Sequence, residues 1–204
     1  VQSGAIFQST SDTEVLLQLI ARSKSNGVIN RFVDALKQID GAYALVALTA
    51  DKLIGARDPL GIRPLILGKL ENRFILSSET CALDIIGAKF IREVENGEVV
   101  YIEDDELKSL KPFPLRKKRP CIFEYIYFSR PDSLLDGITA YEYRKKLGAE
   151  LSKEDKIKAD LVVPVPDSGN AAAIGYSQSK NIKFDLGLIR NHYVGRTFIE
   201  PAQK

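Results

Sequence analysis

The sequence lacks methionine entirely and contains only one histidine and two cysteines among its 204 residues. Two cysteines cannot build the disulfide framework of a small secreted protein, so we expect a reducing cytoplasm. His192 has no serine or cysteine nucleophile beside it in a known motif, and no cluster of histidines and cysteines has zinc spacing. The composition therefore gives no support to a serine-hydrolase triad or a zinc site.

Long apolar runs are also missing. No run approaches the roughly 18–20 residues that a membrane span needs, and no signal peptide is visible. The formal net charge of +2 gives no argument for a nucleic-acid or membrane partner. The chain opens with VQSGAIFQ, without an initiating methionine, and closes with IEPAQK. We therefore interpret it as an internal piece of a longer protein, or as a gene cut at both ends.

The first part of the chain predicts an antiparallel α+β domain. Ser11 and Glu14 have capping-box spacing ahead of an apolar helical face at 11–24, and residues 28–39 repeat the helical period. Short β-rich runs follow at 42–50, 52–57, 63–70, 73–79, 89–94 and 98–103, with one short helix at 79–87. We expect a meandering antiparallel sheet with helices on it, in which DPLGIRPL (58–65) is a hairpin turn.

The second part predicts a parallel α/β arrangement. Prolines and basic residues at 111–120 indicate a solvated linker and the best domain boundary, so we divide the chain into 1–115 and 116–204. The later segments alternate between expected strands and helices: strands at 121–128, 160–165 and 182–189, and helices at 140–153 and 170–180.

The strongest chemical signal is the turn VPDSG between the strand at 160–165 and the following helix. Unpaired N–H groups at a helix N-terminus favour an anion such as phosphate. Gly169 permits close approach of the backbone, and the Ser168 hydroxyl can bind a phosphate oxygen or magnesium. Asp167 is unfavourable beside phosphate unless a metal intervenes or it caps the helix. A plain turn capped by Asp or Ser explains the same residues.

Three other features have both a structural and a functional interpretation. Asp12 suits the first turn of a helix, and its carboxylate can also bind an ammonium group. The aromatic segment FEYIYFSRPDS (123–133) is by default a core strand. The segment NHYVGRTFIEP (191–201) is a poor former of secondary structure, which indicates a functional loop.

Taken together, these stretches resemble the amidophosphoribosyltransferase family (glutamine phosphoribosylpyrophosphate amidotransferases). The resemblance runs from about residue 3 to residue 201 and rests on motifs in a fixed order: SDTE, ARDPLGIRPL, SSETCALD, CIFEYIYFSRPDS, VPDSG and YVGRTFI. It implies the C-terminal part of a type 2, N-terminal-nucleophile glutaminase domain joined to the start of a type I phosphoribosyltransferase domain. It also implies an activity, the transfer of ammonia from glutamine to phosphoribosylpyrophosphate in the first step of purine biosynthesis.

The resemblance assigns roles to individual residues. Asp12 matches the position that binds the glutamine amino group, and Asp167, Ser168 and Gly169 match the pyrophosphate loop, with Ser168 on magnesium. The lining of an ammonia channel and its coupling loop correspond to Phe123, Tyr127, Tyr193, Arg196, Phe198 and Ile199, of which Arg196 couples the two sites. The nucleophile and its oxyanion pair should precede Val1, and two acidic residues that bind the ribose phosphate should follow Lys204, so we expect this chain alone to catalyse neither half-reaction.

The resemblance also bears on the two cysteines, on the substrates and on the rival functions. Cys121 stands where one subclass of the family has a [4Fe–4S] ligand, although an apolar cysteine without a cluster is the alternative; Cys81 is expected to be a buried structural thiol. Glutamine and phosphoribosylpyrophosphate are the implied substrates, and the full-length protein is expected to be a homo-oligomer. The rivals are an inactive remnant or split-gene product, and another glutaminase-coupled enzyme such as an asparagine synthetase.

Overall fold

The computed structural model describes residue 4 and residues 6–193. The chain divides into two compact units, Val1–Cys121 and Ile122–Lys204. This division lies a few residues beyond the boundary expected from the sequence, because the basic segment before Cys121 belongs to the first unit.

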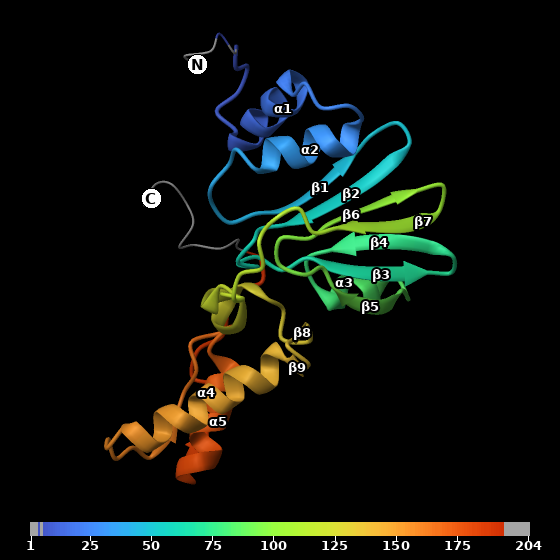
Figure 1. Cartoon of the computed structure of the whole chain (residues 1–204). Coiled ribbons are helices and arrows are strands. Elements are labelled where there is room, and N and C mark those ends of the chain that lie inside the picture. The colour runs from blue at the N-terminus through green and yellow to red at the C-terminus, as the bar shows by residue number, and fades with distance from the viewer. Residues whose placement is uncertain (1–3, 5, 194–204) are drawn as a thin grey trace. The chain divides into compact units, whose positions relative to one another are not determined.

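Two helices begin the first unit, as the apolar periodicity predicts. These are α1 (Asp12–Arg22) and α2 (Val28–Leu36), which lie together beside the sheet that contains β1 and β2 (Figure 1). Leu16 of α1 and Phe32 and Leu36 of α2 are buried in one cluster with Ile54 and Val99 of the sheet. The apolar stripe of each helix thus packs on the sheet, which is the main source of stability for short helices.

The strands of the first unit form two antiparallel sheets instead of the single meander that we expected. One sheet has the order β1 (Ala44–Leu48), β2 (Lys52–Arg57), β6 (Val99–Glu103), β7 (Glu106–Leu110). The other has the order β4 (Arg73–Ser77), β3 (Ile66–Leu70), β5 (Lys89–Glu93), with the short helix α3 (Thr80–Ile85) between β4 and β5 in sequence.

The segment 58–65 is therefore a crossover between sheets, and the prediction of a hairpin turn is wrong. It leaves β2 in one sheet and enters β3 in the other. Between the sheets lies a second apolar cluster formed by Leu65, Val94 and Val100. Gly55 permits the sheets to approach, because a Cβ there would lie 2.6 Å from Cδ1 of Leu76.

The second unit begins with a short π-helix, η1 (Glu124–Phe128), where we expected a strand. The physical reason is a residue distant in sequence. The buried guanidinium of Arg144 donates hydrogen bonds to the carbonyls of Tyr125 (2.8 Å) and Ser129 (2.7 Å), which satisfies acceptors at the end of the helix. Of the aromatic side chains in this segment, only Tyr125 is buried.

Up to residue 193, where the described part of the second unit ends, its remaining elements are two helices and short strands. The helices are α4 (Ala140–Glu154) and α5 (Asn170–Lys180). The strands β10 (Leu161–Val162) and β11 (Lys183–Phe184) pair in parallel, and β8 (Leu134–Leu135) and β9 (Ile138–Thr139) form a small antiparallel pair. Both expected strands of the parallel pair thus exist, but each is only two residues long.

Candidate functional site

Asp12 is the first residue of α1 and is exposed to solvent. Its Oδ1 accepts a long hydrogen bond of 3.4 Å from Oγ1 of Thr13. Because it lies at the helix N-terminus, its negative charge is favoured by the helix dipole. The carboxylate therefore lies in the first turn of a helix, as the structural interpretation expects, and its contact with an ammonium group stays a prediction.

Glu14 organises the chain that precedes Asp12. Its carboxylate accepts hydrogen bonds from the backbone N–H of Gln8 and of Ser9, each 2.8 Å, and from the Ser9 hydroxyl at 2.6 Å. These hydrogen bonds, that of the Ser9 hydroxyl first, hold the pKa of Glu14 below its usual value. The expected capping box is wrong in detail, since the Ser11 side chain makes no capping hydrogen bond and Glu14 binds residues 8 and 9 instead.

The loop after β10 has the strand–turn–helix form that the sequence predicts. Gly169 is the N-cap of α5, and its N–H donates to the carbonyl of Val165 at 3.1 Å. A Cβ at Gly169 would lie 2.6 Å from that same oxygen, so the tight turn requires glycine. The Pro166–Asp167 peptide bond is cis. Ser168 is exposed on the turn.

Two further side chains at this loop, one of them from a later part of the chain, were not foreseen from the sequence. Arg190, after β11, donates from Nη1 to Oδ2 of Asp167 at 2.9 Å, an exposed ion pair. Arg190 thus balances the negative charge of Asp167. The charge of Asp167 was the reason why the sequence made this carboxylate unfavourable beside phosphate. Asn170, the first residue of α5, has a buried Oδ1 with no hydrogen-bond partner among the described residues. The sequence carried no motif that marks Arg190.

The predicted channel residues are only partly described. Phe123 and Tyr127 are 55% and 45% exposed, and Phe128 lies between them, with ring centroids 5.9 Å from Phe123 and 6.0 Å from Tyr127. The prediction of an aromatic core strand is therefore wrong at these positions. Tyr193 is fully exposed. Arg196, Phe198 and Ile199 lie outside the described residues.

The two cysteines lie in different surroundings, and both are free thiols. Cys81, on α3, is buried, in agreement with the expected structural thiol. Cys121 is half-buried, and its N–H donates to the carbonyl of Ile62 at 3.0 Å. Within the described part of the chain, no group of three or more His, Cys, Asp and Glu side chains is placed to hold a metal ion.

Comparison with known proteins addresses both units. The sequence model of a glutamine amidotransferase domain matches residues 1–84. The amidophosphoribosyltransferase of Rhizobium etli is 55% identical over 209 residues, which cover 100% of this chain and 42% of the relative. That of Bacillus subtilis is 48% identical over 201 residues, covering 98% of this chain and 42% of the relative. This chain is homologous to the amidophosphoribosyltransferases along its whole length.

A solved structure supports the same relationship for the fold. The glutamine phosphoribosylpyrophosphate amidotransferase from B. subtilis, complexed with ADP and GMP, matches with a TM-score of 0.92 and 46% identity over 99% of this chain and 44% of that chain. The expected fold class, an α+β part followed by an α/β part as in that amidotransferase, is confirmed. The chain spans about two fifths of the length of the amidophosphoribosyltransferases that it matches.

Two other observations concern the place of such proteins in the cell. A chloroplastic amidophosphoribosyltransferase of Arabidopsis thaliana is 48% identical over the whole of this chain, so relatives occur outside the bacterial cytoplasm. None of the helices in the described residues has both the length and the apolar character needed to cross a membrane.

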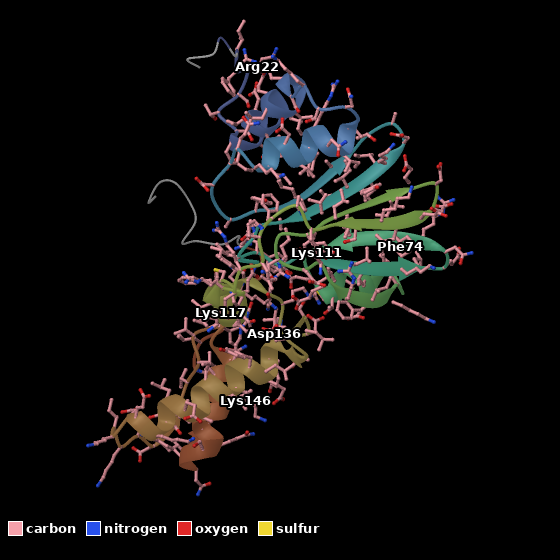
Figure 2. All side chains as sticks on the ribbon, viewed as in Figure 1. Arg22, Phe74, Lys111, Lys117, Asp136 and Lys146 are labelled. Atoms are coloured by element: carbon pink, nitrogen blue, oxygen red, sulfur yellow. The ribbon has the colours of Figure 1, made fainter. Side chains whose placement is uncertain are left out.

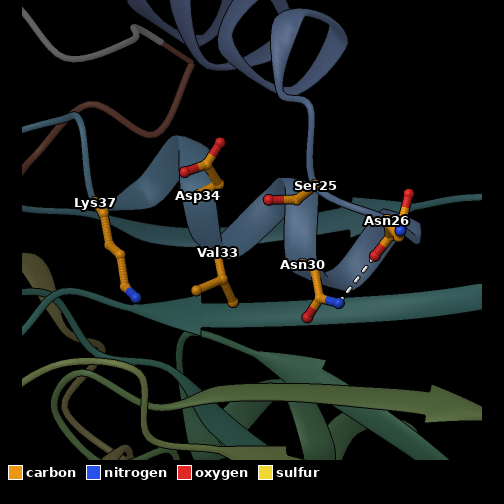
Figure 3. Close-up of a pocket in the computed structure, with 6 residues that line it drawn as sticks. All are labelled: Ser25, Asn26, Asn30, Val33, Asp34 and Lys37. Atoms are coloured by element: carbon orange, nitrogen blue, oxygen red, sulfur yellow. Dashed lines mark hydrogen bonds between the residues drawn. The ribbon is translucent and has the colours of Figure 1, made fainter.

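A polar hollow of ≈ 430 Å³ on the first unit contains none of the predicted site residues. It is lined by the loop before α2 and by one side of that helix: Ser25, Asn26, Asn30, Val33, Asp34 and Lys37 (Figure 3). Across it, Nδ2 of Asn30 donates to the carbonyl of Asn26 at 2.8 Å. Asp34 accepts a hydrogen bond from the Ser23 hydroxyl at 2.6 Å, and we assign the hollow no function.

Proposed function

We propose that this chain forms part of an amidophosphoribosyltransferase, which transfers ammonia from glutamine to phosphoribosylpyrophosphate to give 5-phosphoribosylamine, the first step of purine biosynthesis. The observation that carries the proposal is the 48–55% identity to such enzymes over both units. Residues 1–115 then contribute to glutamine hydrolysis and residues 116–204 to the transferase. A homo-oligomer and a cytoplasmic location remain predictions.

In this proposal Asp12 binds the α-amino group of glutamine. A carboxylate selects a free ammonium through a charge-assisted hydrogen bond, which excludes a glutamine whose nitrogen is in a peptide bond. The clamp from Glu14 to residues 8 and 9 supports this role, because it fixes the chain just before Asp12.

The loop 164–170 binds the pyrophosphate group. The start of α5 offers backbone N–H groups at the positive end of the helix dipole, and the exposed Ser168 hydroxyl is an oxygen ligand suited to magnesium. The pairing of Arg190 with Asp167 also fits, since it lowers the repulsion of an anion. Magnesium, when bound, neutralises phosphate charge; Ser168 orients it, and Gly169 keeps the turn tight.

The exposed aromatic residues contribute to a passage for ammonia. Phe123 and Tyr127 present apolar surface, and we place Tyr193, Phe198 and Ile199 in the same lining, with Arg196 coupling the two sites. An apolar passage admits neutral ammonia and disfavours ammonium because a charge without partners is costly in an apolar environment. Cys121 as an iron–sulfur ligand stays a prediction: a [4Fe–4S] cluster needs four thiolates and the chain has two cysteines.

Binding of pyrophosphate tests the transferase half on this chain. Titration of the ¹⁵N-labelled chain with magnesium pyrophosphate should shift the amide resonances of residues 167–171, and Ser168→Ala should weaken binding about fivefold to tenfold. Ser11→Ala is the matched control, since Ser11 is exposed and makes no capping hydrogen bond. Unshifted resonances at millimolar pyrophosphate would contradict the assignment.

Glutamine use tests the other half. In a full-length enzyme that contains this sequence, Asp12→Asn removes the charge and keeps the shape. We expect kcat/KM for glutamine to fall by about tenfold to a hundredfold, because a charged hydrogen bond is lost. Synthesis from added ammonia should be unchanged, and an equal loss of both activities would count against the role of Asp12.

A further inference from the structure

The segment 111–121, which includes the basic run 111–120 expected to be a solvated linker, is bound to the body of the first unit. The N–H of Arg119 donates to the carbonyl of Leu60 at 2.8 Å, and the N–H of Cys121 donates to that of Ile62 at 3.0 Å. From the first of these hydrogen bonds to the second, the donor and the acceptor each advance by two residues along the chain, which is the spacing of a β-ladder. The segment therefore lies along the crossover loop 58–65 instead of passing freely through solvent.

The crossover loop is itself held rigidly. Asp58 is fully buried, and its two carboxylate oxygens accept the N–H groups of Leu60 (2.9 Å) and Ile62 (3.0 Å). The buried guanidinium of Arg57 donates to the carbonyls of Gly61 and Arg63. With both charged side chains bonded to its backbone, the loop presents the Leu60 and Ile62 carbonyls in fixed positions.

Asn96 joins the two segments directly. Its Nδ2 donates to the carbonyl of Pro59 in the loop at 3.1 Å and to that of Arg116 in the basic segment at 2.7 Å. Gly61, with φ of +62°, leaves room for this arrangement, because a Cβ there would lie 3.0 Å from Cβ of Asn96. One amide group thus bridges two backbones.

Glu93 and Phe113 add to the attachment. Oε2 of Glu93 accepts from Nη1 of Arg57 at 2.9 Å and from Nζ of Lys118 at 3.0 Å, which ties the segment to the residue that holds the loop. The Phe113 ring packs against the apolar cluster beneath α1 and α2. The ion pair of Lys111 (Figure 2) with Glu95 is exposed at both partners and adds little.

We propose that Asn96, Glu93 and loop 58–65 form a clasp on segment 111–121, and that Asn96 and Glu93 are thereby positioning residues for the use of glutamine-derived ammonia. The second part rests on the proposed function. A clasped segment holds Cys121, the last residue of the first unit, at the carbonyl of Ile62. Without the clasp Cys121 would be free to leave the crossover loop, and we propose that the use of glutamine-derived ammonia depends on its being held there.

Hydrogen exchange and trypsin test the clasp on the chain itself. We expect the amides of Arg119 and Cys121 to exchange slowly, and Asn96→Asp to speed their exchange at least about tenfold, because a carboxylate replaces a donor between two carbonyls. Trypsin cleavage after Lys117 and Lys118 should accelerate in parallel. Asn30→Asp is the matched control, since it makes the same change at a helix-local hydrogen bond. Rapid exchange at Arg119 and Cys121 in the unsubstituted chain would overturn the clasp.

Activity of a full-length enzyme with this sequence tests the positioning role. Asn96→Asp should lower glutamine-dependent synthesis severalfold while leaving glutamine hydrolysis and ammonia-dependent synthesis unchanged. Lys118→Gln should act in the same direction more weakly, and Lys117→Gln should have no effect. Equal loss of all three activities would mean that the clasp is only structural. Absence of ammonia-dependent synthesis from the unsubstituted enzyme would refute the proposed function and leave the exchange result standing.

Discussion

The two units are held together in different ways. The first unit combines two antiparallel sheets, apolar clusters on both sides of the larger sheet, and buried charged residues bonded to backbone and to partly exposed charged residues. The second unit has one small described cluster, formed by Tyr125, Leu135 and Ala140, and its main contact is a crossing of two helices. We infer that the first unit depends on side-chain networks and the second on close approach of backbone.

The helix crossing is the most sensitive point in the second unit. A Cβ at Gly148 of α4 would overlap the carbonyl oxygen of Ala172 in α5, and a Cβ at Gly175 would overlap that of Lys145. Gly148→Ala should therefore destabilise the second unit by about 3 kcal/mol or more, since neither backbone can move without separating the helices. Thermal unfolding followed by circular dichroism should show an early transition.

The control for this substitution lies on the same helix. Lys146 is exposed on α4 (Figure 2), and Lys146→Ala should leave the unfolding temperature nearly unchanged. Resonances of the first unit should stay in place in the Gly148→Ala variant. If Gly148→Ala and Lys146→Ala unfold alike, the helices do not meet at these glycines and the comparison of the two units fails.

The first unit should be most sensitive at Glu98. Its carboxylate is 2% exposed and accepts hydrogen bonds from Arg92, Ser109 and the N–H of Glu95. Burial raises the pKa of Glu98, but these hydrogen bonds outweigh it, and the pKa lies below its usual value. Because Arg92 is 36% exposed, we expect Glu98→Gln to cost about 2 kcal/mol, below the range for fully buried pairs.

The same network predicts how stability depends on pH. A carboxyl group whose pKa is lowered on folding stabilises the protein above its unfolded pKa of about 4.3, and that contribution is lost as pH falls through the lower folded value. Urea unfolding of the first unit between pH 6 and pH 3 should show this loss, and Glu98→Gln should reduce it. An identical acid loss in both proteins would show that Glu98 does not carry it.

Sequence reasoning succeeded where a local pattern decides the structure. The apolar period of α1 and α2 is set by their own residues, and both helices form where expected. The prediction of a strand in the aromatic segment failed because Arg144, which lies beyond the segment in sequence, binds the carbonyls of Tyr125 and Ser129. The prediction of a hairpin turn at 58–65 failed for a similar reason, since Arg57 binds Glu93 and the Val94 carbonyl, which lie far along the chain.

The candidate site shows the same limit. Asp12 and Ser168 lie at helix starts, as their neighbours in sequence predicted. The pairing of Asp167 with Arg190 was not foreseen, because the return of the chain after β11 brings them together and no motif marks it. The tethering of the basic segment was missed because exposed charge and proline composition say nothing about backbone carbonyls at Leu60 and Ile62.

Two tyrosine hydroxyls, one in each unit, give the smallest predicted effect on stability. Oη of Tyr43 is buried without a hydrogen-bond partner among the described residues, whereas the Tyr125 hydroxyl donates to the Asp136 carboxylate. Tyr43→Phe should therefore leave stability unchanged or raise it by up to about 1 kcal/mol, while Tyr125→Phe should lower it by about 1 kcal/mol. Denaturant unfolding of both variants measures the difference, and equal destabilisation would show that Tyr43 has a partner.

Alkaline pH provides a second measurement on Tyr43. Burial, and then the nearby charge of Asp58, raise the pKa of Tyr43 to about 12. The folded protein keeps this proton while the unfolded chain releases it near pH 10, so stability falls as pH rises from about 10 to 12. Tyr43→Phe removes the group that ionises, and its stability should fall less over this range. An unchanged slope of stability against pH would mean that the Tyr43 hydroxyl ionises as readily in the folded unit as in the unfolded chain. The first unit would then enclose this side chain more loosely than its core packing implies.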